Sequence, residues 1–252
     1  MAGVTTVALL ERKPGISRSL FSRYWRDVHG VMAARIPGFD SYTQNHVSPL
    51  ADVGSVDPEP FEGIAIVTIA DEAHRQGLIE SEVTRHIHRD EQNVFRRALL
   101  YNLAAGHSRI LSKGLAGSIE IFFVVPHGQD GLAIANRLAS NAAVDLHDLT
   151  SGDPAGWNDT DVGADRRFVA LIHTHWSDDA AAHAATREVV AGSGGAVAAY
   201  RLDERHVMVE HGFPTAVGLR GLDAVRTIEE AGAVNQLERE VVTAIYGRLG
   251  VA

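Results

Sequence analysis

Apolar residues in the first part of the chain alternate between strand-like and helix-like spacing. Helical spacing, with apolar residues every three or four positions, predicts helices over Leu20–Ile36 and from Asp71 to about Arg97. Short apolar or alternating runs predict strands. These strands are Val4–Glu11, Phe39–Val47, Gly63–Ala70 and one within Leu99–Leu111. The order β-α-β-β-α-β over residues 1–113 is that of a ferredoxin-like unit.

The same order recurs in residues 114–214. Strands are predicted at Ile119–Val125, Val144–Leu149, Phe168–Trp176 and Ala196–Val209, the last with a turn near Asp203-Glu204. Helices are predicted at Asp130–Ser140 and Asp178–Val190, and the glycine- and proline-containing segment 152–163 predicts a loop. The chain is therefore interpreted as a degenerate tandem repeat.

Two such repeats predict the overall architecture. Helices cover one face of each sheet, and the two open faces are buried when they pack on each other. We therefore expect an α+β fold in which two ferredoxin-like repeats form a pseudo-dimeric α+β barrel. Residues 215–252 predict a C-terminal helical tail whose apolar stripe is interrupted at Ala231-Gly232. That stripe needs a partner, so the tail either caps the barrel mouth or forms a homodimer.

Composition narrows the class of protein. The chain has 252 residues, of which 45% are hydrophobic and 22% charged, as in ordinary globular proteins. A net charge of -9 spread along the chain argues against nucleic-acid and anionic-membrane partners. No apolar run approaches a membrane span, and we see no export signal, so we expect a cytoplasmic protein. Without cysteine, disulfides and thiolate chemistry are excluded.

Candidate chemistry is concentrated between Phe21 and His46. A neutral imidazole takes a proton near pH 7, and a phenol or a second imidazole returns it. Tyr42 and His46 share a strand face, so we predict that they form the catalytic centre, with His29 in support. Asn45 points to the opposite face and would bind substrate there only if a bulge turned it.

Aromatic residues beside these groups suit a flat substrate. We expect Tyr24 and Trp25 to form apolar walls of the substrate pocket. Structural interpretations stay open. Trp25 also fits a core position, and His29 also fits a cap at the helix C-terminus. Asp90 is either a proton-transfer partner or an ion-pair partner of an arginine, and the second interpretation is favoured.

Two His-x-His pairs raise the question of a metal. His86 and His88 diverge on a helix, whereas His173 and His175 share a strand face and are able to chelate one ion. His147 or Asp178 would then be the third ligand. Two ligands alone are a weak signal. We therefore predict no metal and no cofactor, and expect His173 and His175 to line the substrate pocket from the second repeat.

The first repeat carries a distinctive set of residues at Leu9–Gly15, Ser17, Phe21, Tyr24-Trp25, His29, Ala34, Pro37-Gly38, Tyr42, Asn45-His46, Asp90-Glu91 and Phe95. In these residues it resembles the EthD family of the dimeric α+β barrel superfamily. The second repeat lacks a counterpart of the F-x-x-Y-W-x-x-x-H pattern, so we expect one site per chain. The resemblance implies a small cofactor-free barrel from a group that includes isomerase-like and dehydratase-like proteins, monooxygenases and cyclases.

The functional prediction joins the residues to this resemblance. We expect a cofactor-independent acid–base lyase or isomerase, dehydratase-like, that acts on a small cyclic aromatic or polyketide-like substrate. Two alternatives remain: a cofactor-free monooxygenase of the same superfamily, and a non-catalytic barrel that binds a small molecule.

Overall fold

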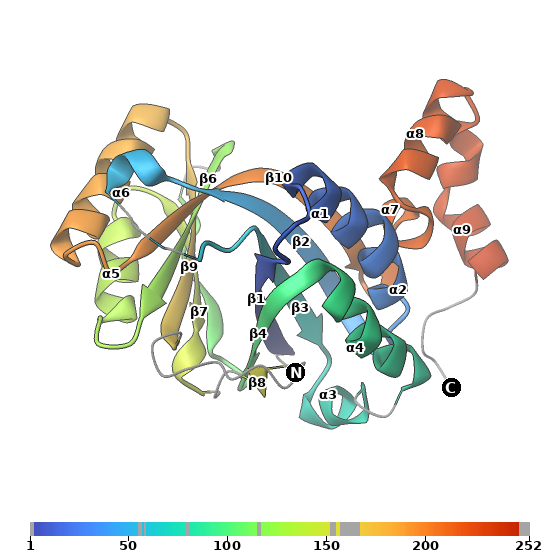
Figure 1. Ribbon diagram of the computed structural model, residues 1–252, viewed down its shortest axis with the longest axis horizontal. Coiled ribbons are helices and arrows are strands. Elements are labelled where there is room, and N and C mark those ends of the chain that lie inside the picture. Colours follow the sequence, from blue (N-terminus) through green and yellow to red (C-terminus); the bar gives the residue numbers. More distant parts are fainter. Residues whose placement is uncertain are drawn as a thin grey trace.

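Eight strands of the two repeats form one antiparallel sheet that is nearly closed into a barrel (Figure 1). The computed structural model describes residues 3–54, 57, 59–78, 81–114, 117–151, 155–156 and 167–246. The first repeat orders its strands β2 (Phe39–Pro49), β3 (Gly63–Ile69), β1 (Val4–Arg12) and β4 (Phe95–Leu103). The second repeat orders its strands β7 (Ala143–Asp148), β9 (Phe168–Trp176), β6 (Ile119–Pro126) and β10 (Ala198–Glu210). Both orders are ferredoxin-like, so the predicted fold class is confirmed.

The repeats are joined through their edge strands. Strand β10 pairs with β2 from Tyr200↔Pro49 to Val209↔Tyr42. Short strand β5 (Ser108–Ser112) pairs with β7 of the second repeat, and β8 (Ala155–Gly156) pairs with β4 of the first. A further short strand, β11 (Phe213–Pro214), pairs with β10. Because β5 crosses to the other repeat, the division of the chain after residue 113 stays a proposal.

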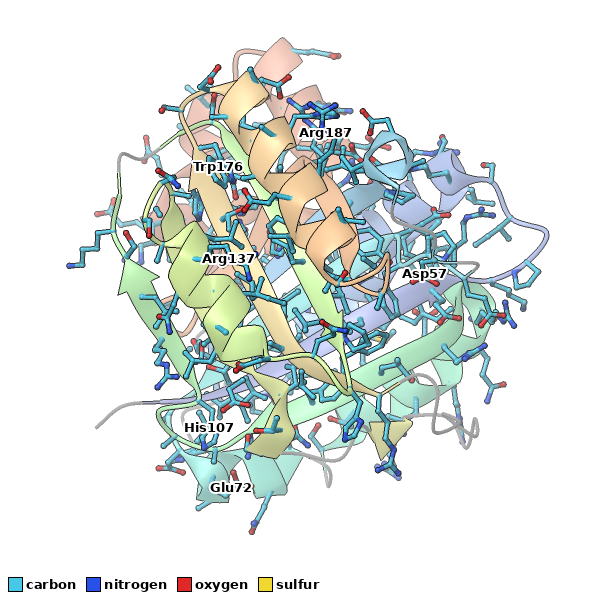
Figure 2. The ribbon with its side chains drawn as sticks, turned by 90° about the vertical axis from the view of Figure 1, so that its left-hand side faces the viewer. Asp57, Glu72, His107, Arg137, Trp176 and Arg187 are labelled. Carbon is cyan, nitrogen blue, oxygen red and sulfur yellow. The ribbon has the colours of Figure 1, made fainter. Side chains whose placement is uncertain are left out.

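Helices cover the outer faces of the sheet. The first repeat carries α1 (Arg18–Tyr24), the π-helical turn η1 (Trp25–His29), α2 (Gly30–Ala33), α3 (Glu72–Leu78) and α4 (Glu82–Val94). The second repeat carries α5 (Gly131–Leu138) and α6 (Asp179–Gly192), which lie over its sheet in Figure 2. Short 3-10 turns follow β2 (η2, Ala51–Val53) and β7 (η3, Leu149–Ser151). Side-chain oxygens of Ser17, Ser81, Asp130 and Asp178 cap α1, α4, α5 and α6.

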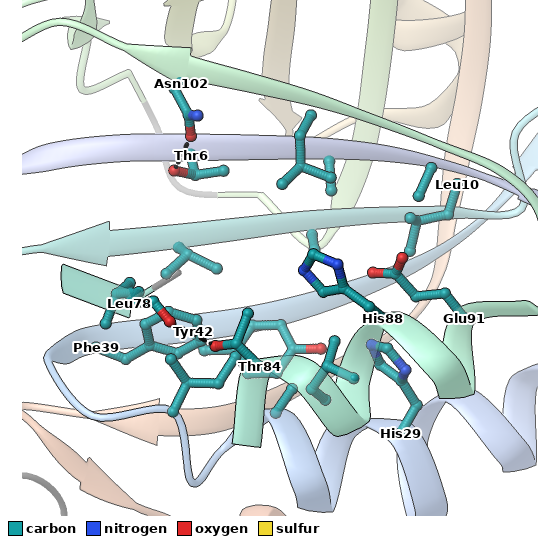
Figure 3. Close-up of a pocket in the computed structure, with 18 of the residues that line it drawn as sticks. Thr6, Leu10, His29, Phe39, Tyr42, Leu78, Thr84, His88, Glu91 and Asn102 are labelled. Carbon is teal, nitrogen blue, oxygen red and sulfur yellow. Dashed lines mark hydrogen bonds between the residues drawn. The ribbon is translucent and has the colours of Figure 1, made fainter. Parts of the chain in front are cut away.

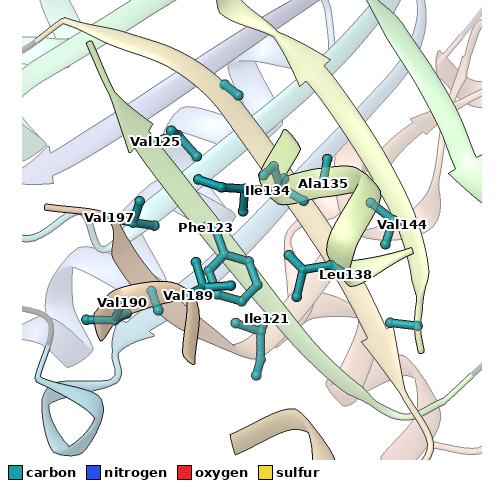
Figure 4. Packing of buried hydrophobic residues seen from close by; sticks show 14 of the residues in the cluster. Ile121, Phe123, Val125, Ile134, Ala135, Leu138, Val144, Val189, Val190 and Val197 are labelled. Atoms are coloured by element: carbon teal, nitrogen blue, oxygen red, sulfur yellow. The ribbon is translucent and has the colours of Figure 1, made fainter. Parts of the chain in front are cut away.

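Three apolar layers follow from the alternation of strand residues. One fills the barrel interior between the two halves of the sheet, with Leu9 and Ile64 from the first repeat and Phe122 and Tyr200 from the second. The second lies between the sheet of the first repeat and its helices. The third lies between the sheet of the second repeat and α5 and α6, where Phe123 and its neighbours interdigitate (Figure 4). The candidate site belongs to the second of these layers.

Three predicted element boundaries were wrong. The helix predicted from Asp71 is two helices, and strand β4 already begins at Phe95, whose backbone is extended. The segment Leu99–Leu111, predicted to contain the fourth strand, holds the end of β4 and also most of a further short strand at Ser108–Ser112, after a turn in which Gly106 has a φ of 85°. Strand β10 has a bulge instead of the turn predicted near Asp203, whose carboxylate is bound by Arg18 and Ser48 of the first repeat. The predicted loop 152–163 lies outside the described residues except for β8.

The C-terminal tail is helical, as predicted. It consists of α7 (Ala216–Arg220), α8 (Leu222–Glu230), the 3-10 turn η5 (Val234–Leu237) and α9 (Arg239–Tyr246). Helix α7 packs against α2 and η1, and the Asp27 carboxylate accepts a 2.7 Å hydrogen bond from the Leu222 backbone N–H. The tail therefore supports the helix that carries Trp25 and His29. Among the described helices, none combines the length and apolarity that a membrane crossing requires.

Candidate functional site

A cavity of about 320 Å³ lies between the sheet of the first repeat and its helices (Figure 3). Its walls are mostly apolar, and alanines at Ala8, Ala33, Ala65 and Ala98 leave the space that larger side chains would fill. The polar groups come from both helices and strands. They are Thr6, His29, Tyr42, Arg75, Thr84, His88, Glu91 and Asn102. A mostly apolar cavity with a few polar groups is the usual form of a small-molecule site.

The π-helical turn Trp25–His29 presents two of the cavity residues. The Gly30 backbone N–H reaches back five residues to the Trp25 carbonyl, which also accepts a 2.9 Å hydrogen bond from the Gln44 side chain. Such turns occur frequently at functional sites. Trp25 lies directly over Gly63, where a Cβ atom would come within 2.7 Å of the indole. The turn therefore fixes Trp25 and His29 over the sheet, and both line the cavity.

His29 is held by a buried carboxylate. Its Nδ1 lies 3.0 Å from Asp90 Oδ2, and the Tyr24 hydroxyl donates to Asp90 Oδ1 at 2.5 Å. Burial acts to raise the pKa of Asp90, but the hydrogen bonds with His29 and Tyr24 outweigh it and lower the pKa. An ionised carboxylate only accepts hydrogen bonds, so Nδ1 of His29 carries a proton and, in the neutral ring, Nε2 holds the basic lone pair.

Glu91 is the second ionisable group at this end of the cavity. Burial, and then the charge of Asp90, raises the pKa of Glu91 to about 8. Its Oε2 is buried and has no hydrogen-bond partner among the described residues. Figure 3 shows Glu91, His88 and His29 gathered at one end of the cavity. At neutral pH Glu91 is therefore a protonated carboxylic acid, and it shares this end of the cavity with the His29 imidazole.

Tyr42 lines the cavity away from these groups. Its hydroxyl oxygen accepts a 2.8 Å hydrogen bond from the Gln44 side chain. Burial raises the pKa of Tyr42 well above its ordinary value, so the hydroxyl keeps its proton. Tyr42 can therefore donate a hydrogen bond to a ligand, but it is a poor source of a transferred proton.

His46 shares the strand face of Tyr42 but lies outside the cavity lining. Its ring packs 4.5 Å from that of Trp25 and 5.0 Å from that of His206, and the Ser22 hydroxyl contacts its Nδ1 at 2.9 Å. Burial, and then the charges of His206 and Arg26, lowers the pKa of His46 to about 3. A histidine so weakly basic and covered by Trp25 is poorly placed to accept a proton from substrate. Of the two histidines that we predicted at the catalytic centre and in support of it, only His29 lines the cavity.

Other predicted residues take different positions. Tyr24 binds Asp90 rather than forming a wall of the cavity. Asn45 faces the barrel interior, where it donates to the Ile64 carbonyl and accepts from Arg205. His173 and His175 lie beside Glu120 of the second repeat and do not line this cavity. The structure thus brings Trp25, His29 and Tyr42 to the cavity and leaves the other predicted residues elsewhere.

Sequence reasoning did not single out Glu91, which lines the cavity. Asp90-Glu91 belongs to the family likeness, but chemistry was predicted only for Asp90. The available signal was helical spacing. Glu91 follows Ile87 by four positions and therefore lies on the apolar face of α4, where an ionisable residue is costly to bury.

Comparisons with known proteins agree with this architecture. Residues 13–97 match the EthD domain, so the predicted likeness is confirmed for this part of the chain. An anthrone oxidase-like protein of known crystal structure superposes with a TM-score of 0.50 at 13% identity, over 82% of this chain and 94% of that one. At this identity the likeness shows the fold alone. No curated protein matches the sequence.

Two further solved structures superpose with lower scores. One, from Lactobacillus acidophilus NCFM, is provisionally assigned as a monooxygenase. It has a TM-score of 0.43 and 12% identity, with 84% of this chain and 98% of that one covered. The other is an EthD family protein from Bacillus halodurans C-125. It has a TM-score of 0.29 and 14% identity, with 39% of this chain and 95% of that one covered. Scores this low carry no functional argument.

Proposed function

Because residues 13–97 form an EthD domain on this barrel, we propose that the chain is a cofactor-independent acid–base lyase or isomerase. Its substrate would be a small cyclic, aromatic or polyketide-like molecule. The observation that carries the proposal is the pairing of His29 with Glu91 in one apolar cavity. The volume of about 320 Å³ falls within the range of small-molecule sites and suits a compact ring system.

His29 would act as the general base. Asp90 accepts the Nδ1–H and fixes the ring, so Nε2 is free to remove a proton from carbon beside a carbonyl group. Asp90 also stabilises the imidazolium that forms. The Tyr42 hydroxyl would donate a hydrogen bond to a developing oxyanion in this mostly apolar cavity.

Glu91 would return the proton. With a pKa of about 8 it is protonated at neutral pH and able to donate to a leaving hydroxyl group or to a second carbon atom. The first outcome is elimination of water, and the second is isomerisation. In both, the proton taken by His29 and the proton given by Glu91 balance, and solvent resets the pair. Activity should fall above about pH 8 as Glu91 ionises.

A proton-exchange experiment tests this step without knowledge of the natural substrate. The protein is incubated in deuterated buffer with small cyclic carbon acids such as tetralone and anthrone, and deuterium incorporation is followed by NMR. We expect faster exchange than in buffer. His29→Gln should slow it by about a hundredfold or more, the usual size of a general-base contribution, whereas Glu91→Gln should slow it less because exchange at one carbon atom needs only the base.

Two exposed positions on α4 provide matched controls, His86→Gln and Glu82→Gln, and neither should change the exchange rate. Binding of each compound is measured separately by ligand-observed NMR. If the compounds bind but the protein gives no exchange above buffer, the chain is a binding barrel and not an acid–base enzyme. Unchanged exchange in His29→Gln would refute its role as the base.

A cofactor-free monooxygenase is the second candidate. It is favoured by the fold shared with the anthrone oxidase-like protein, because removal of a proton from a ring CH₂ group would also begin that reaction. Dioxygen would then supply one oxygen atom to the carbon as a carbonyl and the other to water, which takes both hydrogens. Oxygen uptake with anthrone separates the two candidates. Stoichiometric uptake that is lost in His29→Gln supports oxygenation, and exchange without uptake supports the lyase or isomerase.

A further inference from the structure

Four side chains that commonly surround metal ions meet on the barrel-interior face of the second repeat. His173 and His175 alternate along β9 and share that face. The neighbouring strands add two carboxylates. Glu120 of β6 is paired with His175, and Asp145 of β7 is paired with His173. The cluster lies in the second repeat, whereas the cavity of about 320 Å³ lies in the first, and the two share no residue.

The ring nitrogens divide between the two carboxylates. Glu120 Oε2 lies 2.7 Å from His173 Nε2 and 3.6 Å from His175 Nδ1. The opposite nitrogens face Asp145 Oδ2, at 3.8 Å for His173 Nδ1 and 3.7 Å for His175 Nε2. Each imidazole therefore has one nitrogen toward Glu120 and the other toward Asp145.

An imidazole with a carboxylate at each ring nitrogen resembles a metal-binding histidine. A metal-bound histidine commonly donates its other N–H to a carboxylate, which orients the ring and strengthens the ligand. Ligand atoms from Glu120, His173 and His175 lie within 4.8 Å of one another. Around an ion with bonds of about 2.0–2.1 Å, tetrahedral ligand atoms are roughly 3.3 Å apart. Small side-chain rotations would bring the three atoms to that spacing.

We propose that Glu120, His173 and His175 bind a divalent transition-metal ion, with Asp145 accepting hydrogen bonds from both imidazoles. Two histidines and one carboxylate suit zinc and also suit iron, manganese or cobalt, with further positions open to water or a ligand. The His173 ring is already fixed, because it stacks on Phe122 with centroids 4.0 Å apart and planes at 8°. His175 is 23% exposed and gives an entry route from solvent.

The Arg205 guanidinium is the cation that lies against this cluster in the structure. It donates to both carboxylate oxygens of Glu120 and lies 3.4 Å from His173 Nε2. The same side chain is 32% exposed and comes from β10, so it can swing toward solvent. Because its positive charge opposes a metal ion at short range, Arg205 should weaken metal binding. If Arg205 and a metal ion compete for Glu120 and His173, removal of the Arg205 charge should strengthen metal binding. In a purely structural ion-pair network it should not.

The experiment uses the full chain after dialysis against a chelator. Binding of Zn²⁺ is measured by calorimetry and binding of Co²⁺ by its visible absorption, with Mn²⁺ and anaerobic Fe²⁺ as further arms. We expect one ion per chain. Arg205→Met should tighten binding about tenfold or more. Asp145→Asn should weaken it about 10–100-fold. His175→Ala and Glu120→Gln should abolish stoichiometric binding.

His183 provides the matched control, because its Nε2 pairs with Asp52 at 2.6 Å on the surface outside this cluster. His183→Ala should bind metal as the wild type does, and circular dichroism should show that every variant is folded. Absence of one-to-one binding in both the wild type and Arg205→Met would overturn the proposal. Equal affinity in folded His175→Ala would also overturn it.

Discussion

The two repeats share a fold but use the space between sheet and helices differently. In the first repeat this space holds a cavity of about 320 Å³, whereas in the second it is packed with buried apolar side chains (Figures 3 and 4). The central strands show the cause. The fifth residue of β1 is Ala8, and the fifth residue of β6 is Phe123. Both face the helices, so one position opens the cavity and its counterpart fills it.

The two layers favour different properties, close packing in the second repeat and a cavity with ionisable groups in the first. The packed layer of the second repeat gains from close contact among side chains such as Ile121, Phe123 and Leu138. The first repeat gives up part of that contact and buries Asp90 and Glu91 beside its cavity. Burying ionisable groups costs free energy, and the cost is tolerated where the groups serve a function. The layer between sheet and helices therefore provides close packing in the second repeat and a cavity in the first.

The packed layer should show the largest loss of stability. Phe123→Ala removes a fully buried ring and should lower the free energy of unfolding by about 3–5 kcal/mol, measured by urea denaturation. Leu100→Ala is the matched change on the cavity side, and it should cost less than half as much because Leu100 already borders empty space. Equal losses at the two positions would mean that the two layers are packed alike.

Glu91 should make the stability of the first repeat depend on pH. Its pKa is about 8 in the folded protein and 4.5 in the reference state, so the folded protein binds the extra proton. This contribution is fully present below pH 4.5 and is lost as the pH rises to about 8, at about 1.4 kcal/mol per pH unit at most. Glu91→Gln keeps a neutral side chain and avoids the loss. Its stability relative to wild type should therefore increase between pH 5 and pH 8.

Thermal unfolding across that pH range measures the difference. Exposed Glu82→Gln on the same helix is the control and should follow the wild-type curve. A constant offset between Glu91→Gln and wild type from pH 5 to pH 8 would show that Glu91 titrates normally. The proposed acid would then be ionised at neutral pH.

Sequence patterns predicted the fold because both repeats obey simple periodicities. Alternation along the strands and helical stripes are local signals, and their order fixes a ferredoxin-like unit twice. Bulges and strand ends are different. Strand β10 stays continuous past Asp203 because it pairs with β2, far away in sequence, on both sides of this residue. Contacts between residues far apart in sequence do not show in the spacing of apolar residues along the chain.

The site was predicted only in part for the same reason. Helical spacing and the family likeness indicated Trp25 and His29, and both line the cavity. Strand alternation joined His46 to Tyr42, but alternation does not say where a cavity ends, and Trp25 covers His46. The π-helical turn and the pairing of Glu120 with His175 depend on tertiary contacts and register. Neither can be read from residue types alone.

Filling the cavity should produce the smallest change in stability and the sharpest test of the comparison. Ala8→Phe gives β1 the residue that β6 carries at its fifth position. Because the new ring enters existing space, the free energy of unfolding should stay within about 1.5 kcal/mol of wild type, as for well-accommodated core changes. Ligand binding and deuterium exchange should be lost. Ala199→Phe, which enters the packed layer, should instead cost about 1–3 kcal/mol. If the Ala8→Phe protein is stable and still catalyses exchange, the reaction takes place outside this cavity. The cavity of the first repeat would then need another explanation.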